Sequence, residues 1–240
     1  MERLHKVSAG FIFAFICLHF ANHLIGLEGR DAHQQFIEAA RLIYRHPIVE
    51  MVLLMAFAVQ IITGIALARQ IWAKKKDFIH QLQAASGTYL AAFIVLHVLW
   101  VFIGRMTFNL DTNFDFVAAT MTTPAWSYVS MPFYGLAIVS LFTHIGCITY
   151  DIFKKTDKRL GWACLVVVFG GGLYVTYLIL MMYSGRLYPI TLPEAYTDVF
   201  GHPAVSAPAV EAPAATPQGA DTPDAPKAPD EKTADDSKQN

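Results

Sequence analysis

The chain has 240 residues, of which 55% are hydrophobic, and its mean hydropathy of +0.40 is typical of membrane proteins. The 18 basic and 19 acidic residues give a formal net charge of −1, which excludes a general electrostatic attraction to nucleic acid. Three cysteines lie singly within apolar runs, which argues against a disulfide framework or a zinc site. The sequence also contains no P-loop, GxGxxG or GxSxG motif.

The first apolar stretch, residues 4–29, is long enough to cross a bilayer, yet it carries two histidines near its middle. His19 and His23 are four residues apart, so they share one face of a helix. Ionisable groups at this depth are costly and usually face a bundle interior or a cofactor, and imidazole is a common ligand of haem iron. We therefore expect this helix to supply an axial ligand of a b-type haem.

Five apolar stretches are long enough to span a membrane, since a crossing needs about 20 residues. They are residues 7–27, 47–68, 86–103, 127–150 and 162–183. Between the first two, apolar residues recur at helical spacing over residues 31–45, which predicts a short helix lying in the membrane interface. The expected fold is an all-α integral membrane bundle of five transmembrane helices plus this interfacial helix.

Basic residues predict the orientation of the bundle. If the five helices alternate, one side carries ten basic residues and the other side carries five, an excess that marks the cytoplasmic side. The ten are Arg3, Lys6, Arg69, Lys74, Lys75, Lys76, Lys154, Lys155, Lys158 and Arg159, and the five are Arg30, Arg41, Arg45, Arg105 and Arg186. The N-terminus is therefore expected in the cytoplasm and the C-terminus outside.

The connection at residues 105–126 is long and mildly acidic, and we expect it to cover the outer mouth of the bundle. The chain end is rich in Ala, Pro and charged residues, with no aromatic residue from Pro203 onward, so it cannot bury a core and is expected to be disordered. We predict a bundle domain over residues 1–190 and a disordered tail over residues 191–240.

Helix rise converts position into depth at about 1.5 Å per residue, which places His19 about 18 Å and His97 about 16 Å from the cytoplasmic starts of their helices. Both helices run outward, so the two imidazoles share one level in the outer half. A haem with two histidine ligands needs this arrangement on facing helices. The alternative for each histidine is a hydrogen bond to a neighbouring helix.

The inner level offers a weaker pair. His144 lies about 9 Å and Gln60 about 12 Å from the cytoplasmic ends of their helices, and glutamine is a poor ligand for haem iron. Glu50, just inside the outer end of the second helix, either accepts a proton from a quinol or is an interfacial carboxylate that reaches water. The remaining interface and loop histidines are expected to be solvated: His5, His33, His46 and His80.

Over about its first 185 residues, the chain resembles the single-chain, five-helix cytochrome b membrane anchor of succinate dehydrogenases and fumarate reductases. The resemblance depends on the order and spacing of several short stretches. They are Arg3-Leu4-His5, the HFANH segment from His19, Arg45-His46-Pro47, Glu50, Leu82-Gln83 with Ser86-Gly87, His97-Val98, residues 113–116 with Thr123-Pro124, and His144.

The resemblance implies that His19 and His97 ligate the haem farther from the cytoplasm, and that His144 is one ligand of a nearer haem. The usual partner of His144 is a histidine four residues before a glycine of the second helix. Here that glycine is Gly64 and the position holds Gln60, so one haem b is expected and a second is not.

The resemblance also implies a non-catalytic electron-transfer subunit without a dicarboxylate site. A flavoprotein and an iron–sulfur subunit would dock on its cytoplasmic face, and electrons would pass through haem to or from quinone in a bacterial inner membrane. Two alternatives remain open: a haemless scaffold that holds a dehydrogenase to the membrane, and a b-type cytochrome subunit of another respiratory oxidoreductase.

Overall fold

Five long apolar helices dominate the computed structural model, which describes residues 1–203. They are α1 (Glu2–Ile25), α3 (Pro47–Ala73), α4 (Phe78–Met106), α6 (Pro124–Phe153) and α7 (Lys158–Tyr183). Each is long and apolar enough to cross a membrane, and no strand occurs between residues 1 and 203. The prediction of an all-α bundle in a multi-pass membrane protein is confirmed at this level.

The ends of these helices follow from local sequence. The side chains of Asp77 and Asp157 each accept a hydrogen bond from a backbone N–H in the first turn of α4 and α7. Helices α3 and α6 begin at Pro47 and Pro124, where the missing N–H of proline costs no helical hydrogen bond. The four helices therefore have sharply defined first residues.

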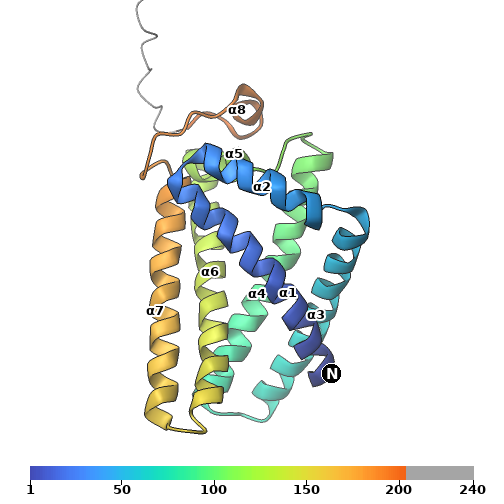
Figure 1. Ribbon diagram of the computed structural model, residues 1–240, viewed down its shortest axis with the longest axis vertical. Coiled ribbons are helices and arrows are strands. Elements are labelled where there is room, and N and C mark those ends of the chain that lie inside the picture. The colour runs from blue at the N-terminus through green and yellow to red at the C-terminus, as the bar shows by residue number, and fades with distance from the viewer. Residues whose placement is uncertain (204–240) are drawn as a thin grey trace, which may run out of the picture. The chain divides into compact units, whose positions relative to one another are not determined.

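Helices α7, α6, α4 and α3 stand side by side in that order, and α1 packs against α3 and runs obliquely across the others (Figure 1). The backbones of α1 and α4 approach each other closely at few points. Side chains therefore bridge the distance between these two helices.

Three short helices lie together at one end of the bundle (Figure 1). They are α2 (Arg30–Tyr44), α5 (Phe114–Thr122) and α8 (Glu194–Phe200), and a 3-10 turn, Gly26–Glu28, links α1 to α2. We name this the capped end, and the opposite end, where the loops after α3 and α6 lie, the uncapped end. Helix α2 occupies the segment for which the sequence predicts a short helix, whereas α5 and α8 were not predicted.

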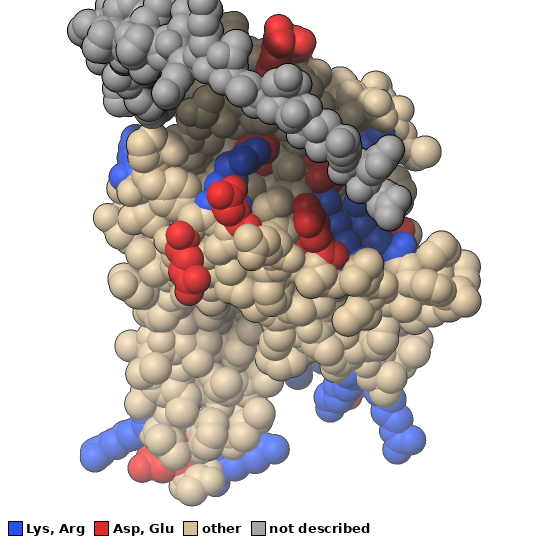
Figure 2. All heavy atoms as spheres, turned by 45° about the horizontal axis from the view of Figure 1, so that its top comes forward, with Lys and Arg blue, Asp and Glu red and all other residues tan. Residues whose placement is uncertain are grey.

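Ion pairs and hydrogen bonds tie the cap together. Arg30 donates two hydrogen bonds of 2.6 and 2.7 Å to Asp115, which is 1% exposed, and these hydrogen bonds raise the pKa of Arg30. Arg41 lies 2.8 Å from Asp111, and the hydroxyl of Tyr196 donates to the Asp111 carbonyl at 2.8 Å. Figure 2 shows charged side chains gathered at this end, with basic residues projecting from the uncapped end.

The predicted tail differs from the structure at its start. Residues 191–203 were expected to be disordered, but they include α8, whose Tyr196 and Phe200 are buried against Phe116 and Trp100. The prediction is wrong for these residues because two aromatic side chains four positions apart give α8 one apolar face. Residues 204–240, the rest of the predicted tail, lie outside the described residues.

Candidate functional site

Three histidines from two helices meet in the half of the bundle nearer the capped end. The ring centroids of His19 on α1 and His97 on α4 are 6.2 Å apart, and the Nε2 atoms of His19 and His23 are 3.1 Å apart. The structure thus brings together the two residues predicted to share a level, with His23 beside them. The two α1 imidazoles direct the same ring atom to nearly the same point.

A phenylalanine one turn earlier packs against each of the two facing histidines. The rings of Phe15 and His19 are stacked with centroids 5.6 Å apart, and those of Phe93 and His97 are stacked at 5.2 Å. Tyr134 packs edge-on against His97 at 5.9 Å. The same local arrangement therefore occurs on both helices, and aromatic rings limit the directions in which the imidazoles can turn.

The imidazole of His97 has an unusual environment. Its Nδ1 is buried and has no hydrogen-bond partner among the described residues. A buried polar group without a partner is costly, and each such case calls for a specific explanation. A bound group that uses this imidazole would supply one.

A second set of polar side chains holds His23 from the capped end. The Tyr183 hydroxyl of α7 lies 2.8 Å from Nδ1 of His23 and 3.0 Å from Nε2 of His33 on α2, and Asn22 lies 2.8 Å from the same nitrogen of His33. Tyr183 and His33 are 1% and 2% exposed. Polar contacts between α1, α2 and α7 therefore converge behind His23.

The prediction that His33 is solvated is wrong, because α2 buries the face that carries it. His33, Ile37 and Ala40 are spaced along one side of α2 and are all buried. Burial lowers the pKa of His33 to about 4, so this imidazole is neutral at physiological pH. The helical spacing of these three residues is the signal that could have identified it.

His144 lies apart from this cluster, nearer the uncapped end. Its Nδ1 is 3.1 Å from the Gln83 carbonyl and 3.5 Å from the Ser86 hydroxyl, both on α4. A Cβ at Gly87 would lie 3.0 Å from the His144 ring, so the imidazole rests directly on the α4 backbone. The structure thus places His144 directly against α4.

Gln60 instead contacts α1. Its amide lies 2.5 Å from the Ser8 hydroxyl and 3.1 Å from Nε2 of His5, and Nδ1 of His5 lies 2.9 Å from the Thr63 hydroxyl. His5 was expected to be solvated, but it is half-buried in this network. These four polar side chains fasten α1 to α3 and satisfy one another.

Glu50 lies at the capped end of α3, where it accepts a 2.9 Å hydrogen bond from Arg105 of α4. It borders a shallow pocket of about 550 Å³ on the surface formed by α3 and Phe102. The other lining residues follow one stripe of α3: Pro47, Met51, Leu54, Met55 and Ala58. The arrangement places one carboxylate at the edge of an apolar groove. The sequence did not predict that Arg105 pairs with Glu50.

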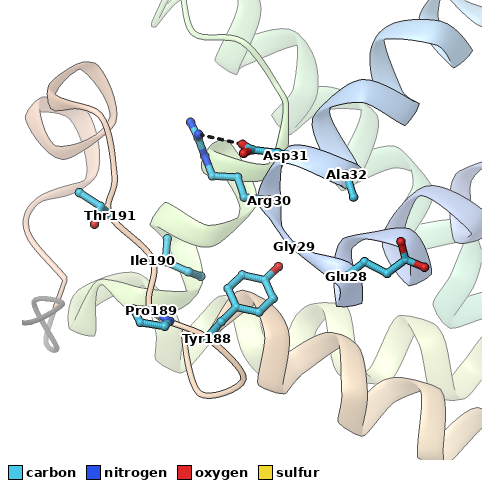
Figure 3. Close-up of a pocket in the computed structure, with 9 residues that line it drawn as sticks. All are labelled: Glu28, Gly29, Arg30, Asp31, Ala32, Tyr188, Pro189, Ile190 and Thr191. Atoms are coloured by element: carbon cyan, nitrogen blue, oxygen red, sulfur yellow. Dashed lines mark ion pairs between the residues drawn. The ribbon is translucent and has the colours of Figure 1, made fainter. Parts of the chain in front are cut away.

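Another pocket, of about 310 Å³, lies at the capped end between the start of α2 and residues 188–191 (Figure 3). The Tyr188 hydroxyl donates a 2.6 Å hydrogen bond to the Gly26 carbonyl, and burial raises the pKa of Tyr188 to about 12. Arg30, the cation of this pocket, is already paired with Asp115 and lies 3.9 Å from Asp31. These pairs leave it little capacity to bind another anion.

Within residues 1–203, no three or more His, Cys, Asp or Glu side chains are arranged to hold a metal ion by themselves. Comparison with models of protein families, with curated sequences and with solved structures found no match to this chain.

Proposed function

We propose that this chain is the haem-carrying membrane anchor of a succinate dehydrogenase or fumarate reductase complex, the family that its short sequence stretches resemble. The observation that carries the proposal is the meeting of buried imidazoles from α1 and α4, with the ring centroids of His19 and His97 6.2 Å apart. An electron-transfer subunit needs a redox group inside the membrane, and this is the place in the described chain that fits one.

The spacing of the imidazoles supports a bis-histidine haem. A metal–imidazole bond is about 2 Å long, so two rings on opposite sides of one metal have centroids about 6 Å apart. A haem iron takes its other four ligands from the porphyrin, which fits a site where the protein offers two facing imidazoles and no larger metal-binding group among residues 1–203. His97 would hold the iron from α4, and the His19–His23 pair would hold it from α1, where His19 is the ligand predicted from the sequence.

Haem bound there would act as a one-electron carrier. Phe15 and Phe93, stacked on the two imidazoles, would keep water from the iron and fix the ligand rings. The sparse packing of α1 against α4 is consistent with a planar group between these two helices.

We further propose that only one haem is bound. His144 hydrogen-bonds to α4, and Gln60 contacts Ser8 and His5, which supports a bundle without a haem at the inner level. His144 would remain a cofactor ligand only if another group replaced Gln60.

The membrane arrangement follows the distribution of basic residues. The uncapped end, with Lys74, Lys75, Lys76 and Arg159 exposed, would face the cytoplasm of a bacterial inner membrane and receive the iron–sulfur and flavoprotein subunits. The capped end and the C-terminus would face outward, with α2 lying in the membrane interface.

Quinone would bind at the α3 pocket beside Glu50. An apolar stripe suits an isoprenoid chain, and a carboxylate at its outer end can accept a proton from a quinol. Arg105 would keep that carboxylate oriented. Electrons and protons would then meet at the capped side of the bundle.

The proposal is tested by purifying the chain in mild detergent from cells that express the whole complex. We expect one haem b per chain, a low-spin spectrum, and co-purification of flavin and iron–sulfur proteins. Absence of haem would support the haemless scaffold instead. Haem without the flavin and iron–sulfur partners would favour another respiratory cytochrome, and two haems per chain would contradict the single-haem proposal.

A further inference from the structure

Three arginines from α2 and α4 lie together around Thr112 at the capped end. The guanidinium of Arg41 donates a 3.1 Å hydrogen bond to the Thr112 carbonyl, and Nε of Arg105 donates a 3.4 Å hydrogen bond to the Thr112 hydroxyl. The backbone N–H of Arg45 donates to the Arg41 carbonyl at 3.0 Å, so Arg45 lies one helical turn beyond Arg41 on the same side of α2. We name Arg41, Arg45 and Arg105 the arginine cluster.

The arginine cluster carries more positive charge than the neighbouring carboxylates neutralise. Asp111 lies 2.8 Å from Arg41, and Glu50 lies 2.9 Å from Arg105. Within residues 1–203, no carboxylate lies within 4.0 Å of the Arg45 guanidinium, and this side chain makes no hydrogen bond. Basic and acidic side chains are seen together on this face in Figure 2. Three cations and two carboxylates leave one positive charge unpaired.

The pKa of Arg45 is consistent with this excess of positive charge. Partial burial lowers the pKa of Arg45, and the positive charges of Arg105 and Arg41 lower it further. Asp111 and Glu50 raise the pKa but do not offset these effects. The surroundings therefore disfavour the charge of Arg45, and an anion bound beside it would relieve the repulsion.

Large apolar side chains surround the arginine cluster and are exposed. Leu42 and Met106, each next to an arginine in the chain, are both 81% exposed, and Ile48 at the start of α3 is 63% exposed. In a multi-pass membrane protein, such a mixture of cations and exposed apolar side chains at a bundle end suits the level of the lipid phosphates. A free anion would use only the charge of this surface, whereas a phospholipid would cover both parts.

We propose that the arginine cluster binds the phosphate of an anionic phospholipid, with Arg45 as the main donor and the acyl chains lying on the exposed apolar side chains. A phosphodiester carries one negative charge, which matches the unpaired charge of the cluster. The planar guanidinium can donate two parallel hydrogen bonds to phosphate oxygens. A zwitterionic phospholipid also brings an ammonium group, so it gains less from an unpaired cation.

Two of the three arginines are in place before a lipid arrives. The side chains of Arg41 and Arg105 are only 13% and 20% exposed, and each is held by its carboxylate. Binding therefore restricts mainly the Arg45 side chain, which keeps the entropic cost low. By contrast, Arg30 at the same end already donates two hydrogen bonds to Asp115.

The lipid site is separate from the sites of the proposed function. Leu42, Ile48 and Met106 do not line the groove beside Glu50, so a lipid and a quinone can be bound together. No residue of the arginine cluster belongs to the histidine cluster. The inference therefore stands whether or not the chain carries haem.

The test measures lipid binding to the full chain, purified in mild detergent, by native mass spectrometry. The probes are dioleoylphosphatidylglycerol, which is anionic, dioleoylphosphatidylcholine, which is zwitterionic, and inorganic phosphate. The variants are Arg45→Gln, Arg45→Lys and Arg186→Gln. Arg186→Gln is the matched control, because it removes an exposed arginine after α7, at the same end of the bundle but outside the cluster.

We expect the wild-type chain to bind phosphatidylglycerol at least about fivefold more tightly than phosphatidylcholine, and inorganic phosphate not to compete. Arg45→Gln should weaken phosphatidylglycerol binding by about fivefold, because one cation near the lipid phosphate is lost. Arg45→Lys, which keeps the charge but not the planar pair of donors, should bind with intermediate affinity. Arg186→Gln should bind like the wild type.

Four results would overturn the proposal. They are equal affinity for the two lipids, competition by inorganic phosphate, unchanged binding in Arg45→Gln, and an equal loss in Arg186→Gln. Competition by phosphate would identify a site for free anions, and an equal loss in the control would identify a general effect of surface charge. Should Arg45→Gln not fold, Arg45→Lys decides, because undiminished phosphatidylglycerol binding in that variant would exclude guanidinium recognition. Absence of haem from the wild-type chain would refute the proposed function and leave this inference unaffected.

Discussion

The two halves of the bundle use histidines in different ways. Toward the uncapped end, His5 and His144 each face a neighbouring helix that supplies hydrogen-bonding partners from Gln60, Thr63 or Gln83. Toward the capped end, histidines contact other histidines, and His97 leaves a buried nitrogen without a partner in the described chain. The comparison shows that a membrane histidine is better judged by the partners it meets than by its depth.

Glycines sharpen this contrast. A Cβ at Gly64 would lie 3.3 Å from the His5 ring, and one at Gly87 would lie 3.0 Å from the His144 ring. Both imidazoles therefore pack directly against a glycine of a neighbouring helix, as expected of side chains that fasten helices together. Between α1 and α4, by contrast, side chains rather than backbones make the contact.

The largest expected effect is on haem binding, which should be lost on changing a histidine in the capped half but not on changing one in the uncapped half. His97→Ala removes the only α4 imidazole of the cluster, so we expect the low-spin haem spectrum to disappear and haem content to fall by at least about tenfold. His144→Ala, the matched variant in the other half, should leave both unchanged. Visible spectra and haem quantification check this, and loss of haem in His144→Ala would contradict the proposed single site.

The next effect concerns stability at the capped end. Arg30→Ala leaves the Asp115 carboxylate buried without its cation, so the free energy of unfolding should fall by about 2–4 kcal/mol, less than for a fully buried pair because the Arg30 side chain is 45% exposed. Lys154→Ala, which removes a partly exposed cation beside an equally accessible Asp151 at the uncapped end, should cost less than about 1 kcal/mol.

Unfolding in sodium dodecyl sulfate, followed by tryptophan fluorescence, measures both values. The double variant Arg30→Met with Asp115→Leu should recover most of the loss, because no unpaired charge remains. If the double variant is as unstable as Arg30→Ala, the loss does not come from the stranded carboxylate.

Much of this arrangement was predictable from sequence, and the exceptions share one cause. Helix length and hydropathy predicted the five apolar helices. The equal depth of His19 and His97 along their helices predicted that the two imidazoles lie near each other, and their ring centroids are 6.2 Å apart. Helices α5 and α8 were missed because they are short and become buried only by packing against distant parts of the chain: α5 against α6, α7 and α8, and α8 against α5 and Trp100. The burial of His33 likewise depends on Tyr183, 150 residues away in the chain.

Gln60 illustrates the same limit at the candidate site. The sequence identified it as a departure from the histidine expected at that position, but not as a partner of Ser8 and His5. A hydrogen bond between helices depends on which residues face each other, and hydropathy does not encode this. Position along a helix predicts depth, whereas tertiary packing decides the partner.

A smaller effect is expected when that network is broken. Gln60→Leu leaves His5 and Ser8 without one partner each, so the free energy of unfolding should fall by about 1–2 kcal/mol, while the haem spectrum stays unchanged. Gln70→Leu is the control, because this glutamine lies on the same helix but is exposed. A changed spectrum in Gln60→Leu would mean that the two halves are coupled.

The smallest effect compares two glycines: Gly87, which packs against the His144 ring, and Gly170, which lies in open space. At Gly170 a Cβ would meet nothing within 4 Å, so Gly170→Ala should stabilise α7 by about 0.5–1 kcal/mol through its higher helix propensity. At Gly87 the same change places a methyl group 3.0–3.1 Å from two atoms of the His144 ring. The ring must then move off the Gln83 carbonyl, and we expect a net loss of about 1 kcal/mol. Equal gains at both positions in unfolding titrations would mean that the His144 ring is free to move, and that the uncapped half is less closely packed than its hydrogen bonds imply.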